Sequence, residues 1–388
     1  MLMKKMNRNI VLLSIGFLLM FFAYTSVQQY LTVFFSESGS VNLGYLSLIL
    51  IYVSYVLFSP LSALVVSKIG AKKSILVSSL FYSFFILSLT INSKFLVYIS
   101  SVLLGAFASM LWTAQSVYLI SLSEKNSYGK NTGFFGSLLT LGISMGIIVL
   151  SFLLKFFSFK SSFLFFSIFP VISFLIFFKL KKLKIISIPN RLEVLKKSFT
   201  NKTILKLSVI WFSFNFVFGL TMGIIPLKIK FIFGIFYVGI FSSLFYMFPF
   251  LFSYWVGKYS DKVGRKKMII LLYIITFLNL IVLYFAKETA FLLILGVLLL
   301  ALGQIIIRPV LPAFIGDISN NKNLGNISAL YLMVGNIGLV FALVLSSVFE
   351  ENIIYLTFIL VLLLSLFIIL PLFKLNIKEL KDKISKET

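Results

Sequence analysis

The chain contains a series of apolar runs long enough to cross a lipid bilayer, and these runs limit its fold more than any other feature. A hydrocarbon core about 30 Å thick requires about 20 residues of helix to span it. Within that core each backbone N–H and C=O group must be bonded inside the protein, so runs of this kind fold as helices. Twelve runs meet the requirement, at residues 10–35, 44–67, 73–91, 95–121, 132–154, 161–178, 207–228, 235–257, 268–286, 291–316, 325–349 and 352–373. The sequence therefore predicts an all-α integral membrane protein with twelve transmembrane helices.

The composition excludes several classes of function. Of the 388 residues, 60% are hydrophobic, whereas soluble domains are nearer half apolar. The chain has no Cys and no His, so disulfides, thiol chemistry and the usual zinc sites are excluded, as is the commonest proton carrier at neutral pH. The sequence carries no nucleotide-binding loop, catalytic triad or pair of carboxylates. We therefore predict that the chain is not an enzyme and needs no cofactor or metal.

Positive charge is concentrated on alternate links between the runs, and this distribution sets the orientation. With the N-terminus inside, 28 of the 35 Lys and Arg residues lie on cytoplasmic segments and 6 lie on outer links. Cytoplasmic loops carry such an excess, so both termini are predicted to be cytoplasmic in a multi-pass protein of the cell membrane. The same distribution accounts for the net charge of +24 through anionic lipid, without a nucleic-acid partner.

One link is much longer than the others and divides the chain. It contains Pro189 and Asn190, followed by a candidate short amphipathic helix near residues 191–199. The predicted organisation is an N-terminal six-helix bundle at 1–178, a cytoplasmic linker at 179–206, a C-terminal six-helix bundle at 207–373 and a cytoplasmic tail at 374–388. The expected partners are the lipid bilayer and a small-molecule substrate, and the chain is expected to act as a monomer.

The polar link between the eighth and ninth runs carries a motif. Residues 257–267 read GKYSDKVGRKK, with fixed positions at Gly257, Asp261, Lys262, Gly264, Arg265 and Lys266. This motif resembles the signature loop of the major facilitator superfamily, which implies two pseudo-symmetric six-helix bundles and a gating role for the loop. We expect Gly257 to permit close helix approach and Gly264 to permit a tight turn. Asp261 is expected to accept hydrogen bonds from the free N–H groups of the next helix and to pair with Arg265.

A degenerate copy of the motif lies half the chain earlier. Residues 63–73 read ALVVSKIGAKK, and a shift of 194 residues brings Gly70 onto Gly264. This copy differs at three positions, where Ala63 replaces Gly257, Ser67 replaces Asp261 and Ala71 replaces Arg265. Repeated halves are typical of secondary transporters. We therefore predict a secondary active or facilitative transporter of a small organic solute, working by alternating access.

The first half has a more particular resemblance. The stretches are GFLLMFFAYTSVQQYL (16–31), GYLSLILIYVSYVL (44–57), KIGAKK (68–73) and LLGAFASMLWTAQSVYL (103–119). They are similar to the Unc-ninety-three-like branch of the same superfamily, some members of which act as channel regulators or receptor-trafficking helpers. The resemblance therefore implies an alternative, a membrane regulator or scaffold that does not transport.

Charged residues inside the runs are the candidates for substrate contacts. None of the 11 acidic residues lies deep in a run, which argues against proton coupling by a carboxylate, and only Glu37 and Asp317 stand at helix ends. Arg308 is the exception among the cations, with Gln304 one turn before it. An Arg inside a span costs roughly 2.5–3.5 kcal/mol on insertion scales, so we expect it to face a central cavity. The alternatives are that carbonyl groups freed by Pro309 and Pro312 bind its guanidinium, or that its side chain snorkels inward.

The repeat extends this candidate site. A shift of 194 residues carries Arg308 onto Ala114, which lies between Trp112 and Gln115. The other polar or amphipathic residues expected at that depth are Tyr24, Gln28 and Asn215. The predicted site is an aromatic wall with amide groups and one fixed cation, which favours an anionic substrate. For Trp112 and Tyr24 the alternative is ordinary helix packing.

Overall fold

The structure is a computed structural model, and it describes residues 7–31, 34–35, 40–91, 93–184, 191–222, 224–233, 235–286, 289–349 and 351–387. Its helices are α1 (Arg8–Gln29), α3 (Val41–Ile69), α4 (Ala71–Ser88), α5 (Lys94–Ser121), η2 (Lys125–Ser127), α6 (Tyr128–Leu153), α7 (Phe159–Phe178), α8 (Arg191–Thr200), α9 (Lys202–Met222), α10 (Ile224–Phe233), α11 (Ile235–Val263), α12 (Arg265–Ala286), α13 (Ala290–Ile318), α14 (Leu324–Val348), α15 (Glu351–Phe373) and α16 (Ile377–Glu387). Within the described residues, twelve helices are long and apolar enough to span a membrane, which confirms the predicted number.

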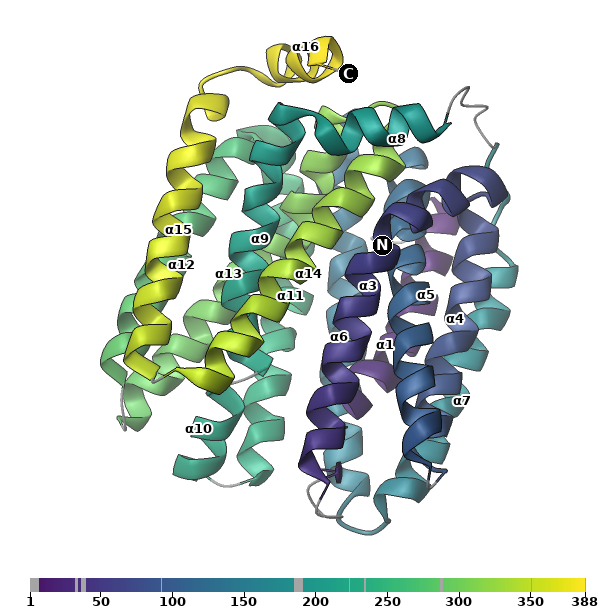
Figure 1. The fold of residues 1–388 in the computed structure, drawn as a ribbon, viewed down its shortest axis with the longest axis vertical. Coiled ribbons are helices and arrows are strands. Elements are labelled where there is room, and N and C mark those ends of the chain that lie inside the picture. The colour runs from purple at the N-terminus through teal and green to yellow at the C-terminus, as the bar shows by residue number, and fades with distance from the viewer. Residues whose placement is uncertain are drawn as a thin grey trace.

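The spanning helices form two groups that stand side by side (Figure 1). Helices α1 and α3–α7 make up one group, and α9 and α11–α15 make up the other. Across the boundary, α6 packs on α11 and α3 packs on α14. The short helices α8 and α16 lie across one end of the molecule and α10 lies at the other, so we call these the α8/α16 end and the α10 end. The domain boundaries predicted from the sequence stay a prediction.

Small residues allow the two groups to meet backbone against backbone. A Cβ atom on Gly133 of α6 would lie 2.4 Å from the carbonyl oxygen of Ser253 of α11. Further toward the α10 end, the hydroxyl of Ser144 donates to the carbonyl oxygen of Ser243 at 3.0 Å. Close backbone contact of this kind stabilises the association of helices in lipid, where burial of apolar surface contributes little.

Many serine hydroxyls inside the spans are bonded within the protein, although a smaller set is buried without a hydrogen-bond partner among the described residues, namely Ser78, Ser137, Ser162, Ser253 and Ser328. Ser14 donates to the carbonyl oxygen of Ile10, four residues earlier, at 2.8 Å, and Ser47 donates to Leu43 at 2.6 Å. Ser62 and Ser109 share a hydrogen bond of 2.5 Å between α3 and α5. Bonds to the preceding turn satisfy the hydroxyl without a partner helix, so serine is tolerated in these apolar helices.

The linker and the end of the seventh span differ in part from the expectation. The amphipathic helix expected near residues 191–199 is confirmed as α8, whereas Pro189 and Asn190 lie outside the described residues. The seventh span was predicted at 207–228, but α9 covers Lys202–Met222 and a separate helix, α10, follows it. Lys228 and Lys230 lie in α10, outside the seventh span.

The segment predicted as a cytoplasmic tail contains a packed helix, α16. The carboxylate of Glu379 accepts the N–H group of Asn376 at 2.7 Å while Asn376 caps the Glu379 N–H group, so α16 starts with a capping box. Leu380 and Ile384, four residues apart, are buried, and Glu387 accepts hydrogen bonds from Thr203. This i, i+4 pattern was readable in the sequence.

The charges around α16 show which part of the α8/α16 end it covers. Burial lowers the pKa of Lys381, and the nearby positive charge of Lys125 lowers it further, while Asp317 and Asp382 oppose the shift. Lys125 belongs to η2 of the first group, so α16 lies over the second group close to the boundary.

Candidate functional site

A cavity of about 270 Å³ lies between the two groups of helices. It is lined by side chains from α1, α3, α4, α5 and α6 of the first group and from α9, α11, α13 and α14 of the second. Among the described residues, no Asp or Glu lines it. We call it the central cavity. Its position between the groups is where solute sites occur in transporters built from repeats.

Six of the seven cavity residues predicted from the sequence line the central cavity. They are Tyr24 and Gln28 from α1, Trp112 and Gln115 from α5, Asn215 from α9 and Arg308 from α13. Gln304 does not line it, and instead borders a void of about 20 Å³ between α9, α11, α12 and α13. A step of four residues turns a helix by about 40° beyond one full turn, which moves Gln304 away from the direction of Arg308. Whether the six residues bind a substrate stays a prediction.

Arg308 is the charged group of the central cavity. Its guanidinium makes no hydrogen bond or ion pair with any described residue, and its Nε atom is fully buried. The alternative in which freed carbonyl groups bind it is therefore not what the structure contains. Nearby, the carbonyl oxygen of Pro309 accepts a hydrogen bond from the hydroxyl of Thr132 at 2.7 Å, which joins α13 to α6. A buried cation without a partner is chemically suited to pair with an anion.

The position of Arg308 depends on the neighbouring helix α6. A Cβ atom placed on Gly136 would lie 3.1 Å from the Cβ atom of Arg308. The absence of a side chain at Gly136 therefore makes room for the Cβ atom of Arg308, and a larger residue at 136 would displace the Arg308 side chain. This contact joins the first group to the cation of the second at the level of the cavity.

Aromatic side chains make up much of the remaining wall. Tyr24 packs edge-on against Tyr82 with ring centroids 4.9 Å apart, and Trp112 packs against Phe21 at 5.1 Å. The sequence reasoning missed the further aromatic lining residues Tyr52, Tyr55, Tyr82, Trp211 and Tyr246. Tyr52 and Tyr55 were the readable ones, because residues three apart share a helix face.

The amide groups of the cavity differ in how far they are satisfied. The Gln28 side chain donates to the hydroxyl of Tyr52 at 2.9 Å, and Asn215 donates to the carbonyl oxygen of Trp211 at 2.9 Å. Gln115 is 4% exposed and has no hydrogen-bond partner among the described residues. Its amide therefore offers both a donor and an acceptor to a bound molecule.

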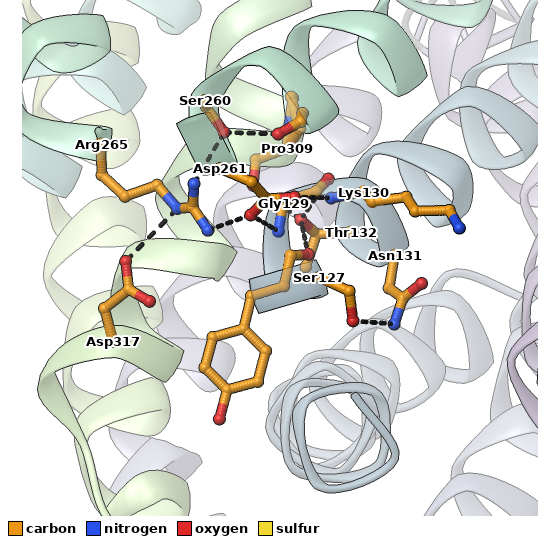
Figure 2. A network of polar contacts seen from close by, with 12 residues as sticks. Ser127, Gly129, Lys130, Asn131, Thr132, Ser260, Asp261, Arg265, Pro309 and Asp317 are labelled. Atoms are coloured by element: carbon orange, nitrogen blue, oxygen red, sulfur yellow. Dashed lines mark hydrogen bonds and ion pairs between the residues drawn. The ribbon is translucent and has the colours of Figure 1, made fainter. Parts of the chain in front are cut away.

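A second polar site lies at the α8/α16 end, around the signature motif (Figure 2). The carboxylate of Asp261 accepts the backbone N–H groups of Gly129 and Lys130, each at 2.9 Å. It also pairs with Arg265, as predicted, and the Arg265 Nε atom lies 3.3 Å from Oδ2 of Asp317. This last contact is an ion pair without the alignment of a hydrogen bond. We call these five residues the clasp.

The clasp corrects one expectation about Asp261. The free N–H groups were expected from the next helix, α12, but they come from the start of α6, in the other group of helices. The reason is the close contact of α6 and α11, since a Cβ atom on Gly257 would lie 2.1 Å from the carbonyl oxygen of Gly129. Asp261, one turn later, therefore meets the α6 N-terminus, whose partial positive charge favours a carboxylate.

The other motif residues have separate roles. Gly264 adopts φ +99°, which confirms the expected tight turn, since other residues rarely take this conformation. Lys266 donates to the carbonyl oxygen of Leu375 and so holds the end of α15, and Lys262 is exposed. A gating role for the loop stays a prediction.

The two acids considered for proton coupling are not equivalent. Asp317 forms the ion pair with Arg265 in the clasp, at the end of α13 and away from the central cavity. Glu37 lies outside the described residues.

Comparison with known proteins settles the family. The sequence model described as Major Facilitator Superfamily matches residues 12–235 and 207–388. The chain belongs to the Major Facilitator Superfamily. The superfamily and its fold are those of membrane transporters, so the chain is a multi-pass membrane protein with a transporter fold.

Curated relatives of this superfamily member carry the Unc-93 name. The chain is 33% identical to UNC93-like protein MFSD11 of Xenopus tropicalis over 141 residues, which are 36% of this chain and 32% of that protein. It is 31% identical to UNC93-like protein 3 of Arabidopsis thaliana over 121 residues, 31% of this chain and 25% of that one. These identities support the predicted Unc-ninety-three-like relationship. The matched segments cover about a third or less of the length of these relatives.

Solved structures of superfamily members share the whole fold. The human organic anion transporter MFSD10 (TETRAN) superimposes with a TM-score of 0.75 at 14% identity, covering 94% of this chain and 100% of that one. The proton:xylose symporter XylE gives 0.78 at 12% identity, covering 96% and 98%. At these identities the similarity shows the fold alone, and it confirms the predicted major facilitator architecture.

Proposed function

We propose that this chain is a secondary active or facilitative transporter of a small organic solute that carries an anionic group, and that the solute binds in the central cavity. The observation that carries the proposal is Arg308, a cation without a partner among the described residues, in a cavity that no described acid lines. A cation buried without a counter-charge is costly, and a bound carboxylate or similar group offsets that cost.

The lining also favours a particular kind of anion. Aromatic rings bind flat apolar bodies through stacked and edge-on contacts, and the wall holds several Tyr residues besides Trp112 and Trp211. The free amide of Gln115 adds a polar contact at a fixed place. We therefore propose an amphipathic organic anion, with an aromatic or similarly flat body and one acidic group.

Alternating access is supported by contacts between the two groups at both ends of the cavity. At the α8/α16 end the clasp joins α11 to α6. At the α10 end the side-chain amide of Gln29 donates to the hydroxyl of Ser242 at 3.3 Å, which joins α1 to α11. Transport through this cavity requires each set of contacts to break in turn while the other holds.

The orientation and setting of the protein are part of the same proposal. The excess of Lys and Arg on alternate links supports a cytoplasmic α8/α16 end, which carries both termini, in the cell membrane. We propose that the protein works as a monomer, with lipid as its surroundings, with no nucleic-acid partner and without enzymatic activity.

Thermal unfolding of the purified protein with matched ligands tests the substrate class. The probes are 4-hydroxybenzoate and indole-3-acetate, each compared with its neutral amide. A ligand at a hundred times its Kd stabilises by about 2.7 kcal/mol, which is a measurable rise in Tm. We expect each acid to raise Tm more than its amide, and Arg308→Ala to abolish the difference. Gln304→Ala is the matched control, because Gln304 lies one turn away on the same helix but outside the cavity.

Uptake by proteoliposomes then separates transport from the alternative of a regulator or scaffold. We expect the acids that raise Tm to accumulate in liposomes that contain the protein and not in empty ones. Binding without uptake would support the regulator. Equal effects of acid and amide in the wild-type protein would refute the anionic substrate.

A further inference from the structure

A second cavity, of about 300 Å³, lies at the α8/α16 end beside the degenerate copy of the motif. Its walls come from the turn between α3 and α4, from α5, and from the start of α14. This is the place that corresponds to the clasp when the two halves of the chain are exchanged. We call it the first-half cavity, and it is separate from the central cavity.

The first-half cavity contains the helix terminus that corresponds to the one bound by Asp261. Asp261 binds the N–H groups of Gly129 and Lys130, the second and third residues of α6. The second and third residues of α14 are Gly325 and Asn326, and both line the cavity. Their N–H groups have no hydrogen-bond acceptor among the described residues, and α14 has no side-chain cap. The two N–H donors that Asp261 binds at the start of α6 therefore have free counterparts at the start of α14.

The sequence explains why the donors are free. Ser67 stands where Asp261 stands in the second half, and its hydroxyl donates to the carbonyl oxygen of Leu64 in its own helix at 2.7 Å. Ala71 stands in the place of Arg265. The first half therefore supplies neither the carboxylate nor its cation, and their volume is left open.

The side chains around the first-half cavity indicate the charge of a ligand that it could bind. Asn326 is 7% exposed, lines the cavity and has no hydrogen-bond partner among the described residues. Lys184 and Lys322 also line it, and no described acid does. Free N–H groups at a helix N-terminus, a buried amide and two cations together favour an acceptor-rich anion.

We propose that the first-half cavity binds a phosphate group, either free or on a lipid headgroup, which takes the place of the carboxylate that Ser67 lacks. The bound phosphate accepts the N–H groups of Gly325 and Asn326 and faces Lys184 and Lys322. It thereby joins α14 to the turn between α3 and α4, across the boundary of the two groups. The proposal does not depend on which solute the central cavity takes.

Binding of this kind stabilises one state of the protein. The site exists only while α14 and the turn between α3 and α4 are together, so the anion favours the state in which the α8/α16 end is closed. The clasp does the same in the second half with a built-in carboxylate. The acceptor of one contact is therefore built into the chain, and the acceptor of the other is a bound anion.

Thermal unfolding of the full chain in phosphatidylcholine nanodiscs tests the proposal. Inorganic phosphate is titrated at constant ionic strength against chloride, and a second set of nanodiscs contains phosphatidic acid without free phosphate. We expect one or both sources to raise the Tm of the wild-type protein. Ser67→Asp supplies the missing carboxylate, so it should raise Tm without phosphate and weaken the response at least tenfold, because two anions would compete for the same donors.

A second pair of variants keeps the test decisive if Ser67→Asp fails to fold. The double variant Lys184→Gln with Lys322→Gln changes two exposed side chains and should weaken the response by a similar factor. Lys94→Gln, an exposed lysine at the α10 end, is the matched control and should respond like the wild type. A response to phosphate alone assigns a soluble ligand, and one to phosphatidic acid alone assigns a headgroup. No response to either source, or equal responses in the wild type and the double variant, would overturn the proposal.

Discussion

Replacement of Asp261 by Asn tests whether the clasp holds the α8/α16 end closed. The Asn side chain keeps one carbonyl oxygen, which accepts one of the two N–H groups of α6, while its NH₂ group faces the other. One charge-assisted hydrogen bond is therefore lost, worth roughly 1.5–3 kcal/mol, and the Lys130 or Gly129 N–H group is left without an acceptor. Arg265 keeps Asp317 as a counter-charge, so its contribution to the loss is small.

The expected loss is thus about 2–3 kcal/mol in the closed state alone, which shifts the equilibrium between closed and open about 30- to 150-fold. The chain has no Cys, so a single Cys reports this shift directly. Ser116 lines the central cavity, and Ser116→Cys is reached by a membrane-impermeant maleimide from the α8/α16 side only when that end opens. We expect its labelling rate in proteoliposomes to rise by the same factor.

Ser67→Ala is the matched control, because the Ser67 hydroxyl bonds only within its own helix turn. It should leave the labelling rate close to that of the parent. A folded Asp261→Asn protein labelled within twofold of the parent, or two variants with equal effects, would refute the role of the clasp.

Three further predictions follow from the same geometry. Arg308→Lys keeps the charge but loses the planar set of donors, so an anionic substrate should bind to it about tenfold more weakly. Arg308→Ala should weaken substrate binding about 10- to 150-fold. Unchanged affinity in both variants would exclude a substrate contact. Gly257→Val should lower stability by about 1–3 kcal/mol through overpacking against the Gly129 carbonyl, measured as a lower Tm, and an unchanged Tm would contradict the contact. In intact cells an impermeant thiol reagent should label Ser158→Cys but not Asn126→Cys, and the reverse pattern would invert the proposed orientation.

The spanning helices could be predicted because lipid leaves the backbone so few choices. The apolar run at 95–121, for example, became α5 at Lys94–Ser121. The ends of the helices were harder to predict where one apolar helix follows another directly. Residues up to 228 were assigned to the seventh span, but α9 ends at Met222 and α10 starts at Ile224, and only Lys228 and Lys230 hint at this.

The residues of the candidate site could also be predicted only in part. Arg308 and the amides were predictable, because a polar group inside a span must face something other than lipid. The wall of Tyr residues was readable only at Tyr52 and Tyr55, which share a helix face, since a single Tyr is common on any helix face in a membrane. The partner of Asp261 was missed because it comes from α6, over 130 residues earlier, and only the packing of α6 on α11 brings them together.

The short helix α8 has a mechanical consequence for the whole molecule. It is the linker between the two halves, yet it also rests on α3 of the first and on α9 and α14 of the second. We expect that a separation of the halves at this end also requires α8 to leave one of these contacts. The α8 helix would then help the clasp to hold this end closed, although the two share no residue. We expect the pace of opening to depend in part on these ten residues, none of which lines the cavity.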